Sequence, residues 1–505
     1  MGRTASLPER VASGGAVQGS GPLSSGESLD PADWDAVRAQ GHRMLDQMFD
    51  HLQGLRETPV WRPIPEAVRE RFREPLPVAP GDLAAAHETF MHEVAAYSGG
   101  NLHPGFMGWV QGAGTPIGML AEMLAGGLNA NLGGRDHMPI AVEQQVVQWA
   151  RQMFGFPATA SGLFVTGASM ANFIGVLVAR QKALGSDVRR LGLAADPRRL
   201  TAYASTAAHS CVPRAMEMAG LGVEALRLIP VDRHHRIDLS ALAGAIAADR
   251  AAGFTPFLIV GSAGTVDVGA VDDLSALADL AAREEVWLHV DGAYGALGVL
   301  AADVAPRLAG LERADSLACD FHKWGQVPYD AGFILVRDAE AHRAAFASPA
   351  AYLQRETRGL AAGEHWPCDF GPDLSRGFRA LKTWLTFKVL GTAAIGAAIS
   401  RSCALARELE GLIRAHPRLE LLAPAQLNIV CFRYAHAGID PDAVNRRIVA
   451  DLHEAGEVAP SLTRIDGKTA IRAALFNHRT ERRDLEALVR GAAAFGDAAL
   501  RADAA

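Results

Sequence analysis

The sequence predicts an α/β protein in which a large domain with a mostly parallel sheet precedes a smaller α+β domain. Between about residues 85 and 350, short apolar runs such as FLIVG (257–261), VWLHVDG (286–292) and GFILVR (332–337) alternate with stretches of helical periodicity. Strands covered on both faces are typically continuous apolar runs, and helices between them indicate a parallel sheet. A length of 505 residues also exceeds one simple core.

Four segments follow one another along the chain. Residues 1–30 are rich in Gly and Ser and poor in apolar residues, so we expect a disordered tail. Residues 31–84 join a helix-like periodicity to a proline-rich stretch, which predicts an arm of helical and extended segments. Residues 85–376 form the predicted large domain. In residues 377–505 a long helical region precedes the strand-like runs NIVCFRY and AIRAALF, which predicts the small domain.

Composition and charge exclude several classes of function. The net charge of -7 leaves no basic face for nucleic acid. The most apolar window, LFVTGASMANFIGVLVA, contains polar residues and is too short to predict a membrane span. Five cysteines without C-x-x-C spacing argue against a disulfide framework or a metal site. We therefore expect a protein of a reducing, cytoplasmic compartment with no nucleic-acid partner.

The run LFVTGASMANFIGVLVARQ predicts a strand that leads through Gly167, Ala168 and Ser169 into a helix. Small residues at a helix start leave backbone N–H groups free to meet an anion, and the serine hydroxyl adds a donor. The same pattern is equally typical of a tight helix cap.

Two further strand ends carry charged residues. Asp291 follows VWLHV, where it is either a turn former or a buried carboxylate that needs a cation. Lys323 lies between His322 and Trp324, where it either reaches solvent or is partly desolvated, with a lowered pKa, and forms a Schiff base. An anion-binding helix start, a carboxylate and a lysine together supply the three anchors that pyridoxal phosphate needs.

Eight motifs occur in the order found in one enzyme family, namely NLHPGFMGWV, TGASMANF, AHSCVPRAMEMAG, GTVDVGAVDDL, LHVDGAYG, DFHKWG, AYLQR and LSRGFRALKTW. From about Pro31 to its end, the chain resembles the pyridoxal-phosphate-dependent group II amino acid decarboxylases, the aromatic-L-amino-acid decarboxylase type. The resemblance implies an aspartate-aminotransferase-like fold (fold type I), with a mostly parallel seven-stranded sheet in the cofactor-binding large domain. It also implies that the N-terminal arm serves dimerisation.

The resemblance assigns roles to individual residues. Lys323 would hold the cofactor covalently, and Asp291 would pair with the protonated ring nitrogen, which makes the ring an electron sink. The remaining cofactor-binding positions are Ala168 and Ser169 at the phosphate, assisted by His322, Thr265 near the phenolic oxygen, and Ala293 and His209 on the two ring faces.

Tyr352 matches the family tyrosine that protonates the α-carbon after CO2 has left, on a stretch that resembles the family's mobile loop. In relatives with phenylalanine there, decarboxylation is accompanied by oxidative deamination to an aldehyde. Because this chain has Tyr352 and His209, the resemblance favours simple decarboxylation to the amine.

The substrate is less constrained. Trp109 occupies a position that is aromatic in aromatic-specific relatives, whereas Asn131 and Gly133 stand where those relatives carry bulky apolar residues from the neighbouring subunit. Arg135 and Asp136 either recognise a charged side chain of the substrate or form a solvated charge pair on the surface. We expect a homodimer with active sites at the interface that decarboxylates an aromatic or bulky L-amino acid.

Other functions stay open at this point. The chain could decarboxylate aliphatic or acidic amino acids, or could be an aminotransferase or a decarboxylating aldehyde synthase on the same cofactor. It could also be a non-catalytic binding protein, against which the presence of Lys323, Asp291 and His209 argues.

Overall fold

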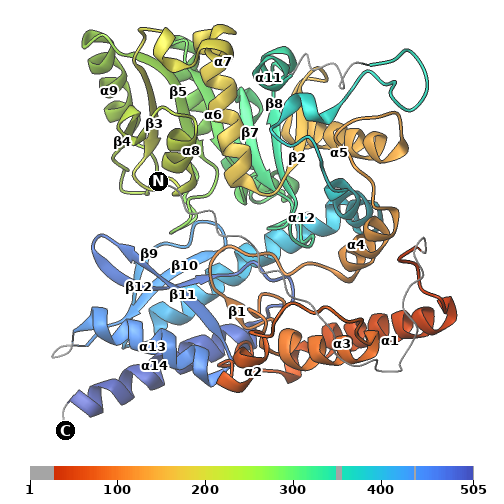
Figure 1. The fold of residues 1–505 in the computed structure, drawn as a ribbon. Helices are drawn as coiled ribbons and strands as arrows, with labels where there is room; N and C mark the ends of the chain where they lie inside the picture. The colour runs from red at the N-terminus through yellow and green to blue at the C-terminus, as the bar shows by residue number, and fades with distance from the viewer. Residues whose placement is uncertain (1–27, 348–354, 437–439, 504–505) are drawn as a thin grey trace, which may run out of the picture.

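The structure, a computed structural model, describes residues 28–347, 355–436 and 440–503. A large sheet covered by helices lies above a smaller sheet, and the N-terminal helices lie beside the smaller sheet (Figure 1). The predicted α/β fold with a seven-stranded, mostly parallel sheet is confirmed.

The large sheet has the strand order β2-β8-β7-β6-β5-β3-β4. β8 is antiparallel to both of its neighbours, and the other neighbouring pairs are parallel. The strands are β2 (Ser161–Val165), β3 (Leu200–Ser205), β4 (Leu226–Ile229), β5 (Thr255–Ser262), β6 (Trp287–Asp291), β7 (Ser316–Asp320) and β8 (Gly332–Val336).

Helices cover both faces of this sheet, so its strands are buried on both sides. Along β5, Leu258 and Val260 pack in the core with α6 and α8, whereas Ile259 belongs to the core of the opposite face. The helices of this domain are α4 (Pro116–Leu128), α5 (Met138–Phe154), α6 (Ala168–Leu184), α7 (Asp187–Leu191), α8 (Cys211–Met218), α9 (Leu239–Ala251), α10 (Leu274–Arg283) and α11 (Ala339–Phe346).

The small sheet has the order β1-β11-β12-β10-β9. Its elements are β9 (Leu419–Ala423), β10 (Ile429–Tyr434), α13 (Pro441–Ala455), β11 (Ala459–Ile465), β12 (Lys468–Ala474) and α14 (Arg482–Asp503). Its edge strand β1 (Phe106–Met107) pairs in parallel with β11, although it belongs to the segment predicted as large domain. The domain boundaries themselves stay a prediction.

Helix α12 (Arg379–Ala415) links the two sheets. Gly391 has a φ of 73° inside it and divides it into two helices, a conformation that glycine adopts without strain. Among the described residues α12 is the helix long and apolar enough to span a membrane. Its buried Lys382 lies 2.6 Å from Glu122 of α4, so part of α12 packs inside the protein through an ion pair.

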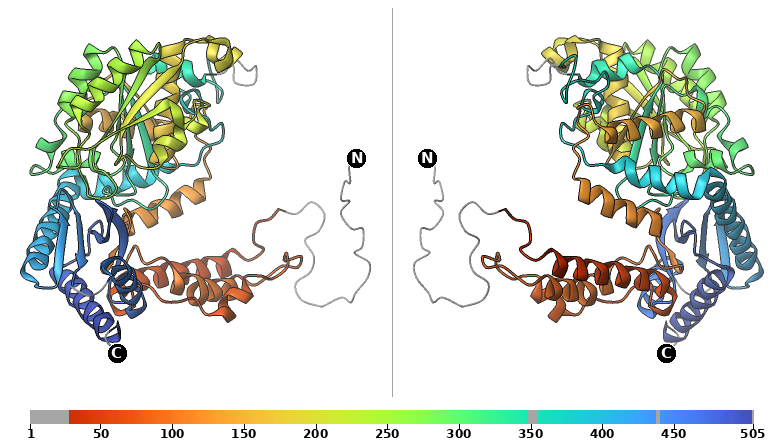
Figure 2. Two further views of the ribbon diagram at one scale, coloured as in Figure 1. Left: turned by 90° about the vertical axis from the view of Figure 1, so that its left-hand side faces the viewer. Right: turned by 90° about the vertical axis from the view of Figure 1, so that its right-hand side faces the viewer.

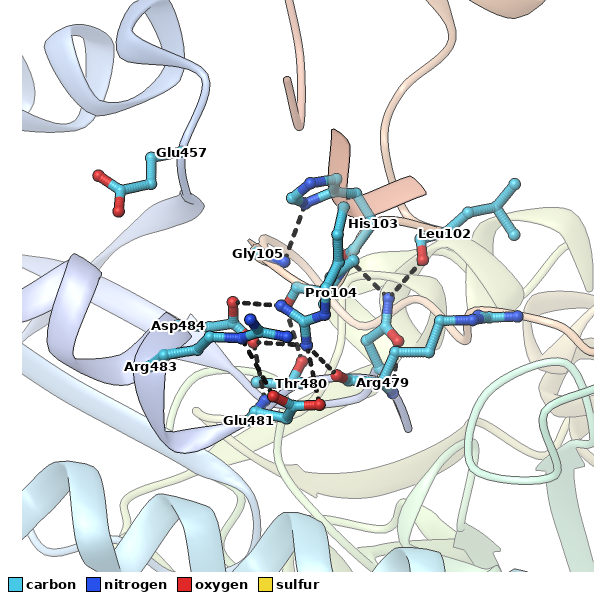
Figure 3. Close-up of polar contacts among 12 residues, drawn as sticks. Leu102, His103, Pro104, Gly105, Glu457, Arg479, Thr480, Glu481, Arg483 and Asp484 are labelled. Carbon is cyan, nitrogen blue, oxygen red and sulfur yellow. Dashed lines mark hydrogen bonds and ion pairs between the residues drawn. The ribbon is translucent and has the colours of Figure 1, made fainter. Parts of the chain in front are cut away.

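The N-terminal arm contains α1 (Trp34–Gln53), α2 (Glu66–Arg71) and α3 (Leu83–Thr89), and it projects sideways from the body (Figure 2). Arg56 joins the arm to the small domain through ion pairs, since its guanidinium lies 3.0 Å from the carboxylate of Asp484 and 3.4 Å from that of Glu481. Beside these ion pairs the Thr480 hydroxyl donates to the Pro104 carbonyl at 2.7 Å (Figure 3).

Candidate active site

A cavity of about 460 Å³ lies at the carboxyl ends of the central strands of the large sheet, where the small sheet meets it. Such strand ends are where open α/β sheets bind ligands. The cavity collects most of the residues predicted as a site, which are Trp109, Ala168, Ser169, His209, Thr265, Asp291, Ala293, His322 and Lys323.

Lys323 lies in the turn after β7, and its Nζ is 2.9 Å from Oδ2 of Asp320. Burial lowers the pKa of the Lys323 ammonium, but the charge of Asp320 and its hydrogen bond outweigh burial, so the pKa is raised above its ordinary value. The expectation of a lowered pKa is therefore wrong for the protein without cofactor. The pairing with Asp320 therefore stabilises the ammonium form of Lys323.

Asp320 is a site residue that the sequence analysis missed. Its Oδ1 accepts the Ala168 N–H at 2.7 Å, so one carboxylate joins the start of α6 to Lys323. His322 Nε2 lies 3.6 Å from the same carboxylate, while His322 Nδ1 accepts the Ala331 N–H at 3.0 Å. Burial lowers the pKa of His322. A carboxylate three positions before the lysine, at a strand end, was the available signal.

Asp291 ends β6 and faces the cavity. Its Oδ1 accepts the Ala293 N–H at 3.1 Å, and the Cys211 thiol lies 3.9 Å from its Oδ2. Burial first, and then the charge of Asp291, raise the pKa of the Cys211 thiol. Cys211 was also missed, because the sequence does not show that it comes beside Asp291.

Two glycines allow the chain to close around Lys323 and the start of α6. A Cβ on Gly332 would lie 2.3 Å from the Gly167 Cα, and one on Gly112 would lie 2.3 Å from the His322 carbonyl oxygen. Both distances are too short for any side chain, so these close approaches require glycine. They bring Ala168 and Ser169 to the cavity edge, as the helix-start motif predicts.

His209 and Thr265 line the cavity, and one side-chain atom of each accepts a hydrogen bond from the backbone. His209 Nδ1 accepts the Cys211 N–H at 3.2 Å, and Thr265 Oγ1 accepts the Ala270 N–H at 3.0 Å. Their predicted contacts with the cofactor ring stay predictions.

The three residues predicted to form the substrate pocket do not all lie at the cavity. Trp109 lines the cavity, but Asn131 Oδ1 accepts the N–H groups of Gly133 (2.9 Å) and Arg376 (3.0 Å) and thus organises a loop. A Cβ on Gly133 would lie 2.0 Å from the Leu374 carbonyl oxygen. In the described part of the chain, the residues that line the cavity do not include Asn131 or Gly133. Tyr352 lies outside the described residues.

Arg472 of β12 is a third missed residue in the cavity wall. The side chain is buried and donates to the carbonyls of Asp267 (3.2 Å) and Trp109 (3.1 Å). In the part of the chain that the structure describes, no carboxylate lies within ion-pair distance of it. Burial accordingly lowers its pKa.

Comparisons with known proteins agree with this site. The family model described as "Pyridoxal-dependent decarboxylase conserved domain" matches residues 86–435. The chain is 34% identical to an aromatic-L-amino-acid decarboxylase of Bacillus atrophaeus, over 88% of this chain and 92% of the relative. It is 30% identical to the L-2,4-diaminobutyrate decarboxylase of Rhizobium meliloti (strain 1021), over 81% of each.

A solved structure from Vibrio parahaemolyticus shares the fold. It is the glutamate decarboxylase domain of diaminobutyrate-pyruvate transaminase and L-2,4-diaminobutyrate decarboxylase, at a TM-score of 0.82 and 26% identity. The superposition covers 92% of this chain and 97% of that chain.

The donor set of the cavity fits pyridoxal phosphate. It offers the Lys323 amine for the aldehyde, the Asp291 carboxylate for the ring nitrogen, and the start of α6 with the Ser169 hydroxyl for the phosphate. Fold and site define a pyridoxal-phosphate enzyme of fold type I. The chain belongs to the pyridoxal-dependent decarboxylase family, and it is an amino acid decarboxylase.

Proposed function

We propose that this enzyme converts an aromatic L-amino acid to the corresponding amine and CO2. The observation that carries the substrate class is Trp109, a large exposed aromatic residue in the cavity wall. The 34% identity to an aromatic-L-amino-acid decarboxylase supports the same choice.

Trp109 is held in place by its surroundings. Its φ of 47° is uncommon for a bulky residue, and such conformations persist only where neighbouring groups enforce them. Its N–H donates to the Ser461 hydroxyl at 3.3 Å and its carbonyl accepts from Arg472, while its ring stacks on Phe106 at 6.2 Å. An aromatic surface fixed in this way suits a flat side chain.

The cofactor and three residues of the cavity have separate roles in the reaction. Bound pyridoxal phosphate supplies the electron sink that accepts the electron pair of the bond to CO2. The carboxylate of Asp291 lines the cavity, where it would pair with the protonated ring nitrogen of the cofactor. Lys323 must pass a proton from Nζ before it can act as a nucleophile, and Asp320 Oδ2 is the acceptor beside it.

Protonation of the α-carbon is the step that separates amine from aldehyde. We assign it to Tyr352, on the resemblance of AYLQR to the family motif. Tyr352→Phe should bind the cofactor as the parent enzyme does, but it should consume dioxygen and release aldehyde, ammonia and hydrogen peroxide with the CO2. Amine alone at the parent rate would contradict this assignment.

A second candidate is a substrate with a charged side chain. Arg472 and Asp267 both line the cavity, and the buried guanidinium donates to the backbone carbonyls of Asp267 and Trp109. The relationship to an L-2,4-diaminobutyrate decarboxylase supports this candidate. It predicts that Arg472→Met changes the preference between acidic and basic substrates.

We also propose that the enzyme acts as a homodimer joined through its N-terminal arm, in a reducing, cytoplasmic compartment. The arm exposes large apolar side chains, namely Trp34, Val37, Met44, Phe72, Leu76, Val78 and Leu83. Apolar surface of this extent is stabilised by a partner. All five cysteines are free thiols, which agrees with a reducing compartment.

The substrate class is tested by kcat/KM for tryptophan, tyrosine, phenylalanine, leucine, glutamate and 2,4-diaminobutyrate. We expect aromatic substrates to lead, Trp109→Ala to lower their kcat/KM roughly tenfold, and Trp109→Phe to retain most of it. Equal loss for aromatic and charged substrates in Trp109→Ala would contradict a stacking role.

A further inference from the structure

A line of buried polar side chains runs from the interior of the large sheet to Asp291. The side chains come from β6, β7, α6 and the start of α8, and in order they are Trp287, Ser316, His289, Asn172 and Cys211. Ser316, His289 and Asn172 are essentially inaccessible to solvent. Such groups are costly unless each has a partner, and here each has one.

The central member is His289, two residues before Asp291 on β6. Alternate residues of a strand face the same side, so both side chains point toward α6. His289 Nδ1 lies 2.7 Å from the Ser316 hydroxyl, its register partner on β7, and Nε2 lies 2.7 Å from Oδ1 of Asn172. The imidazole thereby links the sheet to α6.

The directions of the hydrogen bonds at His289 follow from the orientation of Asn172 and from the charge of the ring. The Trp287 indole can only donate, and it donates to the Ser316 hydroxyl at 2.8 Å. The Ala168 carbonyl can only accept, and it accepts from Asn172 Nδ2 at 2.9 Å, which turns Oδ1 toward His289. Asn172 Oδ1 can only accept, so Nε2–H donates to it, and a neutral ring then carries no proton on Nδ1 and accepts the Ser316 hydroxyl. Burial lowers the pKa of His289 to about 3, so the ring is neutral.

The last two links reach the cavity. Asn172 Nδ2 lies 3.4 Å from the Cys211 Sγ, and the thiol lies 3.9 Å from Oδ2 of Asp291. The Ala293 N–H donates to the other oxygen. The thiol and the Ala293 N–H thus meet the two oxygens of the carboxylate and hold it in one orientation.

We propose that Ser316, His289 and Asn172 are positioning residues that act through Cys211 on Asp291 and so strengthen the enzyme's hold on the ring nitrogen of its cofactor. This line of side chains, called the relay below, is also supported sterically. A Cβ on Gly175 of α6 would lie 2.7 Å from both Cε1 and Nδ1 of His289, so the ring rests directly on the helix backbone.

Two cofactors that differ only at the ring nitrogen distinguish binding of that nitrogen from binding of the rest of the cofactor. Cofactor-free protein is titrated with pyridoxal phosphate and with 1-deazapyridoxal phosphate, in which C–H replaces the ring nitrogen. The dissociation constants are compared for the parent protein, Cys211→Ala, Cys211→Ser, Asn172→Ala and Gly175→Ala, with unfolding midpoints for the cofactor-free forms.

We expect Cys211→Ala and Asn172→Ala to weaken pyridoxal phosphate roughly tenfold and the deaza analogue less than about twofold, because a hydrogen bond in a line to a charged group is lost. Cys211→Ser keeps a donor and should restore the parent affinity. Cys403→Ala, another buried thiol on α12, is the matched control and should change neither constant.

Gly175→Ala removes no polar group but displaces the His289 ring, so it should show the same selective loss even if Asn172→Ala does not fold. Equal weakening of both cofactors would reduce the relay to a structural role and overturn the proposal. Unchanged affinity in Cys211→Ala, or Cys211→Ser behaving like Cys211→Ala, would overturn it as well.

Discussion

Asp320→Asn should make Lys323 of the cofactor-free protein a faster nucleophile at neutral pH. The substitution removes the charge 2.9 Å from Lys323 Nζ but keeps an oxygen that can accept the Ala168 N–H. A lysine in a largely buried site without its carboxylate loses its proton more readily, because burial then acts alone.

The magnitude follows from the distance. Two unit charges 2.9 Å apart attract by about 6 kcal/mol at an effective dielectric constant of about 20. Hydration of Lys323, whose side chain is 19% exposed, reduces the effect. If a third of this attraction remains, its loss in Asp320→Asn amounts to about 2 kcal/mol. At a pH below the pKa of Lys323, the fraction of the amine that is neutral then rises about thirtyfold.

The assay is the rate at which cofactor-free protein gains the visible absorbance of lysine-bound pyridoxal phosphate, as a function of pH. The parent's pKa is raised, so its rate should climb only at high pH, and the climb of Asp320→Asn should move to lower pH. Borohydride trapping and peptide mapping identify Lys323 as the site. Asp249→Asn, which breaks the ion pair with Arg227 away from the cavity, is the control.

An unshifted pH profile in Asp320→Asn would refute the pairing of Asp320 with Lys323. A profile shifted equally by Asp249→Asn would show that the effect is general loss of stability.

Three further predictions concern the framework. Gly332→Ala forces a Cβ to within 2.3 Å of the Gly167 Cα and should weaken pyridoxal phosphate at least about tenfold in equilibrium titration, whereas Gly126→Ala, where a Cβ meets nothing within 4 Å, should not. Glu143→Gln leaves the buried Arg376 guanidinium without the opposite charge 2.6 Å away and should lower the free energy of unfolding by about 3–5 kcal/mol in urea titration; a loss below about 1 kcal/mol would contradict this. Burial lowers the pKa of His342 from 6.5 to about 3, so the unfolded chain binds the proton first and stability should fall by about 2 kcal/mol from this group between pH 7 and 5. In His342→Gln the fall should be smaller by that amount, and an identical fall would contradict it.

Much of the fold followed from local patterns. Apolar runs predicted β5, β6 and β8, and the position of Asp291 and Lys323 at strand ends placed them at one edge of the sheet. These features depend on neighbours in the sequence, which is why a single sequence suffices for them.

The missed features depend on contacts between distant segments. Cys211 meets Asp291 from 80 positions away, and Arg472 reaches the cavity from the small sheet. Asp320 was visible, but its pairing with Lys323 depends on how the turn after β7 folds. Likewise, β1 joins the small sheet because β11 offers it an edge, and two residues carry no periodicity that could reveal this.

The most direct test is to incubate the purified, pyridoxal-phosphate-loaded enzyme with a panel of L-amino acids and to measure CO2, amine, aldehyde and peroxide together. We predict amine and CO2 in equal amounts from the aromatic amino acids, with Lys323→Ala inactive. Aldehyde with peroxide as the main product, or turnover confined to charged or aliphatic substrates, would contradict the proposed function.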